Sequence, residues 1–160
     1  MSLLLLLGVP LAVMLWFWNK IVFFCQTRLI PWVRSRLGNN AADMLANLIA
    51  FLDKGATFVR RNIRQAYRWL CQNVFGMKSK YAQTGPNTVV ITAETYVMDE
   101  NGNFVKVTST ETAASDDVPA EVRKELLKYG GAAEIDDLNE MKNKIKARAA
   151  EEGIELETAA

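Results

Sequence analysis

The sequence predicts a mainly α-helical membrane protein, in which an N-terminal transmembrane helix is followed by an amphipathic basic helix and a small α+β module of ββαα order. Three observations indicate this class. The stretch 3–24 is apolar apart from Asn19 and Lys20, and apolar residues recur at steps of three and four over 41–75. Further along, two runs rich in β-branched residues flank an Asn-Gly pair. We therefore expect an anchor with an interfacial segment (1–37), a basic helix (38–76), a linker (77–87) and an acidic cytoplasmic module (88–160).

The length of the first apolar stretch is the basis for the predicted anchor. Its 22 residues would extend about 33 Å as a helix, and a hydrocarbon core is about 30 Å thick. The side chains expected at the membrane surface are Trp16, Trp18, Lys20 and Trp32. Lys and Arg follow this stretch and none precedes it, which predicts a single-pass protein with lipid contacts and a cytoplasmic C-terminus. The alternative is a buried core helix of a soluble protein.

The stretch 41–75 predicts a helix that becomes basic after Gly55. Its basic face is formed by Arg60, Arg61, Arg64 and Arg68. Such a face suits contact with anionic lipid or with a partner. The alternative is one leg of a helical hairpin whose arginines are solvated or paired with acids. The polar stretch that follows, 77–87, contains a Gly-Pro pair and predicts the linker.

A β-hairpin is predicted at the start of the acidic module. The runs 88–98 and 104–112 are joined by a segment containing Asn-Gly, which favours a two-residue type I′ turn. In that register the residues that share one apolar face are Tyr96, Met98, Val105 and Val107. A single hairpin is marginal in water, so helices or another subunit are expected to cover this face.

Two helices are predicted after the hairpin. A proline in the first turn and a Gly-Gly pair at the end bound a helix over 118–128. A second helix, over 133–152, carries acids at its start and bases at its end, as the helix dipole favours. A module of about 75 residues has a small core. We therefore expect a homo-oligomer or a subunit of a membrane complex.

The charge distribution limits the partners. Residues 1–80 hold 11 Lys/Arg and 2 Asp/Glu, a net +9, whereas residues 81–160 hold 8 and 16, a net −8. An acidic module repels phosphate backbones, so no direct nucleic-acid binding is expected. The bases that could form a ligand patch within the acidic half are Lys106, Arg123, Lys124 and Lys128.

No catalytic residue, metal site or cofactor is expected. The chain has no His, which is the commonest general base and a frequent zinc ligand. Cys25 and Cys71 lack a metal-like spacing and indicate free thiols. The acids 136, 137 and 140 are typical of the start of a helix rather than of a metal site.

These features favour a membrane-anchored accessory or scaffold protein without enzymatic activity, whose acidic module mediates self-association or docks a partner. The alternative is a ligand-gated oligomeric membrane effector, which forms a pore or disrupts the membrane through a C-terminal sensor domain. In its order of parts the chain is similar to small two-part bacterial defence effectors, such as membrane proteins gated by cyclic oligoadenylates. That similarity of layout implies a sensor within 88–160.

Overall fold

The computed structural model describes residues 11–53, 60–128 and 130–156. Residues 3–10 of the predicted anchor and residues 54–59 of the predicted basic helix lie outside these ranges. The helical elements are α1 (Leu11–Phe24), the π-helical turn η1 (Cys25–Leu29), α2 (Ile30–Leu37), α3 (Asn39–Phe51), α4 (Arg60–Asn73), the 3-10 turn η2 (Ser115–Asp117), α5 (Ala120–Lys128) and α6 (Asp137–Glu151). The strands are β1 (Val74–Gly85), β2 (Thr88–Met98), β3 (Phe104–Ala114) and β4 (Ala132–Asp136).

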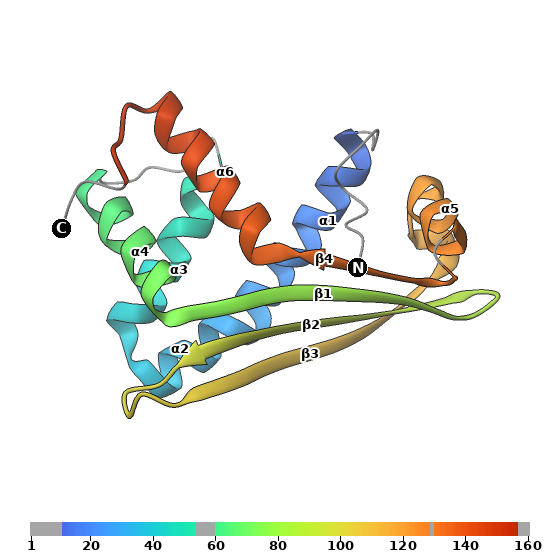
Figure 1. Ribbon diagram of the computed structural model, residues 1–160, viewed down its shortest axis with the longest axis horizontal. Coiled ribbons are helices and arrows are strands. Elements are labelled where there is room, and N and C mark those ends of the chain that lie inside the picture. Colours follow the sequence, from blue (N-terminus) through green and yellow to red (C-terminus); the bar gives the residue numbers. More distant parts are fainter. Residues whose placement is uncertain (1–10, 54–59, 129, 157–160) are drawn as a thin grey trace.

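The four strands of the described chain form one antiparallel sheet in the order β3-β2-β1-β4 (Figure 1). Every second residue of β2 is buried, namely Val89, Ile91, Ala93, Thr95 and Val97. The helices pack on the face that these side chains form, in two hydrophobic clusters. One cluster joins β1, β2 and β3 to α1–α4 and α6, and the other joins the far end of the sheet to α5 and the start of α1. The fold is therefore a mixed α/β arrangement with helices on one face of the sheet.

The structure contradicts the predicted membrane protein. No helix within the described ranges combines the length and the apolar character that crossing a membrane requires. The transmembrane helix, the single-pass topology and the mainly α class are therefore corrected to the mixed α/β fold. α1 is 14 residues long and turns Val13, Phe17, Ile21 and Phe24 into the two clusters. A helix that packs on a sheet and beside other helices is apolar around most of its surface, and that pattern imitates a span.

The stretch predicted as one basic helix and a linker forms two helices and a strand. α3 and α4 occupy most of it, and β1 then begins at Val74. Along β1 the buried side chains of Met77, Ser79 and Tyr81 alternate with lysines that point away from the helices. A positive φ of 93° at Gly76 accompanies a shift in the β1–β2 register, as at a β-bulge. The polar stretch that was predicted to be a linker is therefore part of β1, a strand with β2 on one side and β4 on the other.

The predicted hairpin is present between β2 and β3, but its predicted register is wrong. A turn longer than two residues joins the strands, because the Asp99 amide donates to the Asn103 carbonyl at 2.8 Å. Met98 therefore pairs with Phe104, one residue away from its predicted partner. Relative to β2, this slip moves each side chain of β3 to the other face. Val105 and Val107 therefore share the helix-covered face with Val97 and Thr95 and do not share a face with Tyr96 and Met98. Tyr96 consequently lies on the face away from the helices.

The predicted ββαα order is wrong as well, because a strand precedes the last helix. Residues 132–136 form β4 and pair with residues 78–82 of β1. α6 begins only after this strand, where the Asp136 carboxylate accepts from the Asn139 amide at 3.0 Å and caps the helix. Five residues are too few for their alternation to be told from a first helical turn. The helix predicted over 118–128 is confirmed as α5.

A buried polar cluster ties α6 to β1. The Ser79 hydroxyl donates to Oδ2 of Asp137, and both residues are about 2 % exposed. Asp137 Oδ1 and the Tyr81 hydroxyl are buried and have no hydrogen-bond partner within the described chain. Burial raises the pKa of Asp137 to about 7; the Ser79 hydrogen bond opposes this rise, and the charges of Asp136 and Glu140 add to it. Burial, with the nearby Asp137 charge, also raises the pKa of Cys25 to about 12.

The raised pKa of Asp137 predicts a loss of stability as the pH rises towards neutrality. The folded state holds this proton more tightly than the unfolded chain, so the free energy of unfolding falls between about pH 4 and pH 7 and is level above. The fall is at most about 4 kcal/mol. Asp137→Asn keeps an acceptor for Ser79 without a charge, and we expect it to be increasingly more stable than wild type over this range in urea unfolding. Asp117→Asn, at an exposed acid, should show no such trend. If the free energies of unfolding of wild type and Asp137→Asn differed by the same amount at every pH, the raised pKa of Asp137 would be contradicted.

Candidate functional site

The sheet has a second face, which we call the open face. It consists of the residues that alternate with the buried ones, among them Lys78 and Lys80 of β1, Thr92, Glu94 and Tyr96 of β2, Lys106, Thr108 and Thr110 of β3, and Glu134 and Asp136 of β4. Neither hydrophobic cluster includes a side chain of this face. None of the described helices therefore packs on it, and the open face is available to a partner.

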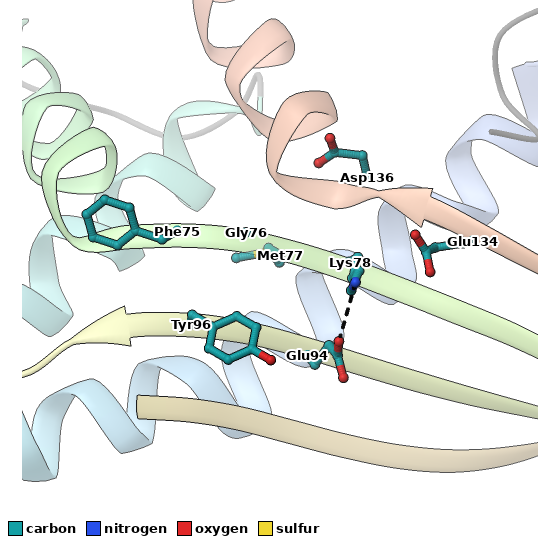
Figure 2. A pocket seen from close by; sticks show the side chains of 8 residues that line it. All are labelled: Phe75, Gly76, Met77, Lys78, Glu94, Tyr96, Glu134 and Asp136. Atoms are coloured by element: carbon teal, nitrogen blue, oxygen red, sulfur yellow. Dashed lines mark ion pairs between the residues drawn. The ribbon is translucent and has the colours of Figure 1, made fainter. Parts of the chain in front are cut away.

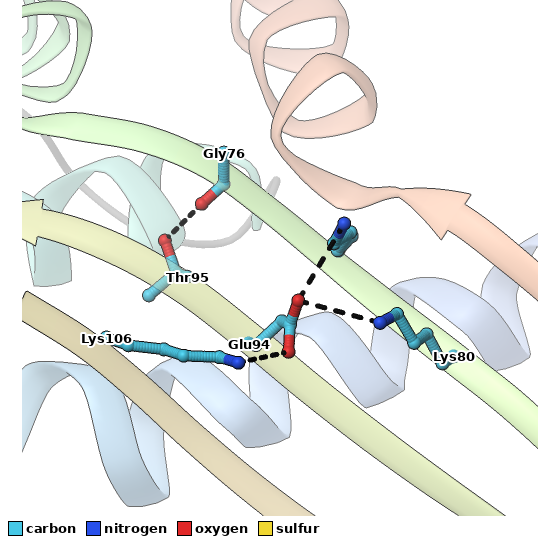
Figure 3. A network of polar contacts seen from close by, with 6 residues as sticks. Gly76, Lys80, Glu94, Thr95 and Lys106 are labelled. Carbon is cyan, nitrogen blue, oxygen red and sulfur yellow. Dashed lines mark hydrogen bonds and ion pairs between the residues drawn. The ribbon is translucent and has the colours of Figure 1, made fainter.

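Three lysines converge on one carboxylate at the centre of the open face. Glu94 is only 7 % exposed. The Lys106 ammonium lies 3.2 Å from its Oε2, and those of Lys78 and Lys80 lie 3.8 Å from its Oε1 (Figure 3). Figure 3 shows that Lys80 and Lys106 reach Glu94 from the strands on either side of β2. Because the three ammonium groups are nearly half exposed, they bring charge to Glu94 without being buried themselves.

This arrangement keeps Glu94 ionised. Partial burial acts to raise the pKa of Glu94, but the hydrogen bond from Lys106 and the charges of Lys80, Lys106 and Lys78 outweigh it and lower the pKa below its ordinary value. The same hydrogen bond and charge raise the pKa of Lys106. A carboxyl with a lowered pKa is a poor proton donor near neutral pH. The cluster is therefore suited to fixing side chains in place.

Charges of opposite sign alternate across the strands of the open face. On β4, Asp136 and Glu134 lie directly opposite Lys78 and Lys80 of β1, and Glu94 of β2 follows. Opposite charges on facing positions stabilise an exposed sheet surface. The face carries three lysines and three acids at these positions, so it has no excess of either sign.

One end of the open face is aromatic and hollowed. The rings of Phe75 and Phe104 meet edge to face with centroids 4.9 Å apart, and Tyr96 carries the Lys106 ammonium at 5.9 Å from its ring centroid. Beside them lies a cavity of about 480 Å³, whose lining includes Phe75, Tyr96, Glu94 and Glu134. Figure 2 shows the rings of Phe75 and Tyr96 on the side of the cavity opposite Glu134 and Asp136 of β4. The cavity therefore has an apolar wall and a charged wall.

The four residues predicted to lie at a membrane surface are half-buried and make contacts within the fold. Trp16 packs with Phe17 and Tyr81, and Trp18 and Trp32 pack against the larger cluster. The Lys20 ammonium pairs with Glu111 of β3 at 2.6 Å. Trp16, Trp18 and Lys20 thus take part in the packing of α1, and Trp32 takes part in the packing of α2.

The predicted basic face and ligand patch are placed as follows. Arg60, Arg61, Arg64 and Arg68 all lie on α4, where Arg68 is exposed and Arg64 is half-buried. The ligand patch is not assembled. Lys106 lies on the open face of β3, whereas Arg123, Lys124 and Lys128 lie on α5, which packs through Val122 and Leu126 on the other face.

Within the described ranges no three acidic or Cys side chains are grouped so as to hold a metal ion. The two cysteines lie away from the open face: Cys25 is buried at the start of η1, and Cys71 is exposed on α4; both are free thiols. The sequence prediction missed Glu94, Phe75 and the lysines of β1. The available signal was the period-two pattern of residues 77–82, with lysines at alternate positions.

Comparison with protein-family models, with curated proteins and with solved structures finds no match to this chain.

The lysine cluster predicts that Glu94→Gln destabilises the protein by about 1–2 kcal/mol at neutral pH, because three neighbouring ammonium groups then lack their common partner. Since the pKa of Glu94 is lowered by folding, its contribution is present above the unfolded pKa of about 4.3 and is lost as the pH falls below it. Urea unfolding of wild type and variant should therefore converge in acid. Glu100→Gln, in the exposed hairpin turn, removes the same charge and should have little effect. An equal effect of both substitutions would refute the cluster's role.

Proposed function

We propose that this protein is a non-enzymatic docking protein, and that its open face binds a segment of a partner protein through an apolar anchor side chain. One observation carries this proposal. Of the six large apolar side chains that are more than a third exposed in the described chain, Phe75, Tyr96 and Phe104 lie together at one end of the open face. Scattered exposed apolar residues are ordinary, whereas a group of them marks an interaction surface.

The cavity beside these rings supports an anchored protein segment. Aromatic side chains are enriched at the centres of protein interfaces, where they line pockets that receive one buried side chain of the partner. The cavity of about 480 Å³ has this form, with Phe75 and Tyr96 on its apolar wall. The fixed charges of Lys78, Glu94 and Glu134 at its other side supply the polar rim.

The charge balance favours protein over nucleic acid as the partner. A phosphate backbone is held by cations in excess. Here the ammonium groups of Lys78, Lys80 and Lys106 all lie within 4 Å of Glu94, and the β4 acids lie beside them. A surface with both signs in register is better suited to the mixed charges of a polypeptide.

The state of Glu94 supports a role without catalysis. A general acid or base that works near neutral pH needs a pKa close to the working pH. The pKa of Glu94, the most buried acid at the cavity, is instead lowered by its lysines. Its role in the proposal is to hold Lys78, Lys80 and Lys106 in fixed positions around the binding surface.

Site-specific photo-crosslinking tests this proposal. A benzophenone amino acid replaces Tyr96 in the full chain, and the chain is irradiated in extracts of the organism that carries it. We expect an adduct with the added mass of a second, different protein. Excess purified wild-type chain should compete it away, and excess Phe75→Ser/Phe104→Ser chain should not. The same probe at Leu127, which is 72 % exposed on α5, is the control and should give no such adduct.

The contradicting outcomes are equally specific. No adduct at Tyr96, or an adduct that the double variant competes as well as wild type, would refute an aromatic docking site. An adduct whose added mass is removed by nuclease would assign the open face to nucleic acid instead.

A further inference from the structure

A groove lies in the helical layer, between α1 and α3. Its volume is about 660 Å³, and one wall is a stripe along α1, η1 and the start of α2 that includes Leu15, Asn19, Val22, Gln26 and Ile30. Ala46 and Ala50 of α3 lie at the groove with spacing of four residues. Small residues at this spacing let another helix approach closely. The groove therefore has the form of a seat for a helix.

The stripe is uncharged and partly exposed: Val22 and Ile30 are half-buried, and Asp53 also lines the groove. Leu15 is 51 % exposed, and Phe23, which adjoins Val22, is 52 % exposed. The exposed amide of Asn19 lies between Leu15 and Phe23, and that of Gln26, seven residues after Asn19, lies beyond Phe23. The π-helical turn η1 has more residues per turn than an α-helix, which keeps Gln26 and Ile30 on the same wall as Leu15. An exposed apolar stripe of this kind is typical of an interaction surface.

The chemistry of the stripe is the same when it is read in either direction. About a centre between Val22 and Phe23, the apolar and amide positions along the middle of the stripe have like partners at the same distance on the other side, whereas Trp18 at the groove's edge mirrors Thr27. The apolar pairs are Leu15 with Ile30 and Val22 with Phe23, and the amide pair is Asn19 with Gln26. A two-fold interface requires this property, because residue i of one copy meets residue j of the other and the reverse contact also occurs. A different partner places no such demand on the sequence.

We infer that this groove is the interface between two copies of the chain, whose α1 helices cross antiparallel with the two-fold axis beside Val22 and Phe23. Asn19 of each copy then meets Gln26 of the other. Each amide can both donate and accept, so the two pairs are mutually satisfied. Leu15 of each copy packs on Ile30 of the other. From Leu15 to Ile30 the contact extends about 24 Å at 1.5 Å per residue.

The interface is separate from the docking surface of the proposed function. It involves α1, η1 and α3, whereas docking uses the open face of the sheet. Failure of one proposal therefore leaves the other intact, and two copies would present two open faces to a partner.

The mass of the full chain in sedimentation equilibrium tests the interface. We expect a dimer at about 100 µM, at which a complex with a Kd of about 1 µM is largely associated. Leu15→Asp should raise the dissociation constant at least tenfold, because two carboxylates enter an apolar contact. Leu127→Asp is the matched control: it places the same charge at an exposed leucine of α5 and should leave the constant unchanged. Circular dichroism verifies that both variants are folded.

Replacing the Asn19–Gln26 amide pair with an ion pair tests the proposed pairing without altering the apolar contacts. Asn19→Asp alone should weaken the dimer, and Asn19→Asp with Gln26→Lys should restore it to within about threefold, since each interface then contains two ion pairs. Failure of the second substitution to restore association would refute the antiparallel pairing.

Disulfide crosslinking tests the register. In a Cys71→Ser background, where the remaining native thiol, Cys25, is buried, Leu15→Cys chains mixed with Ile30→Cys chains should crosslink on oxidation. Neither variant should crosslink with itself, and Leu15→Cys mixed with Ser35→Cys should not crosslink. A monomeric wild type, equal weakening by the two leucine substitutions, or crosslinks in the single variants would each overturn the inference.

Discussion

The structure depends on burial of one face of the sheet and exposure of the other. In β2 the side chains from Val89 to Val97 at odd positions face the helices, and the even positions face away. With a side-chain period of two, this choice fixes the faces of the residues paired in register with β2, and the bulge at Gly76 interrupts the alternation beside Phe75. Through it, Glu94 and Tyr96 reach the open face, and the lysines of β1 and β3 arrive beside Glu94. The candidate site is thus a consequence of strand register.

The same constraint explains the apolar N-terminal part of the described chain. α1 must cover the buried face, and it does so with Phe17 and Ile21 while its other side faces α3 and solvent. The cost of fixing α6 over the same face is a buried carboxylate, Asp137, held by Ser79. Buried polar groups of this kind reduce stability and restrict the alternatives for packing. The two candidate surfaces thus lie on different layers: the stripe along α1 belongs to the helical layer, and the aromatic cavity belongs to the open face of the sheet.

Sequence patterns predicted the local structure better than its assembly. The hairpin and α5 were predictable because turn chemistry and a helix stop are local signals. β1 was not, since its alternating lysines resemble a linker until β2 and β4 pair with it on both sides. The face of Tyr96 depended on the length of the turn, which is closed by several hydrogen bonds to Asp99 and one from Asp99 to Asn103. The apolar stretch of α1 was assigned to lipid because its composition does not distinguish a lipid environment from a sheet and helices packed around it.

The most direct measurement compares two adjacent thiols on β2 in a Cys71→Ser background. Thr95→Cys replaces a fully buried side chain of similar size, and Tyr96→Cys replaces one on the open face. The structure predicts rapid reaction of the Tyr96→Cys chain with maleimide and protection of the Thr95→Cys chain until denaturant is added. Rapid reaction at Thr95→Cys with protection at Tyr96→Cys would contradict the register, and with it the open face itself.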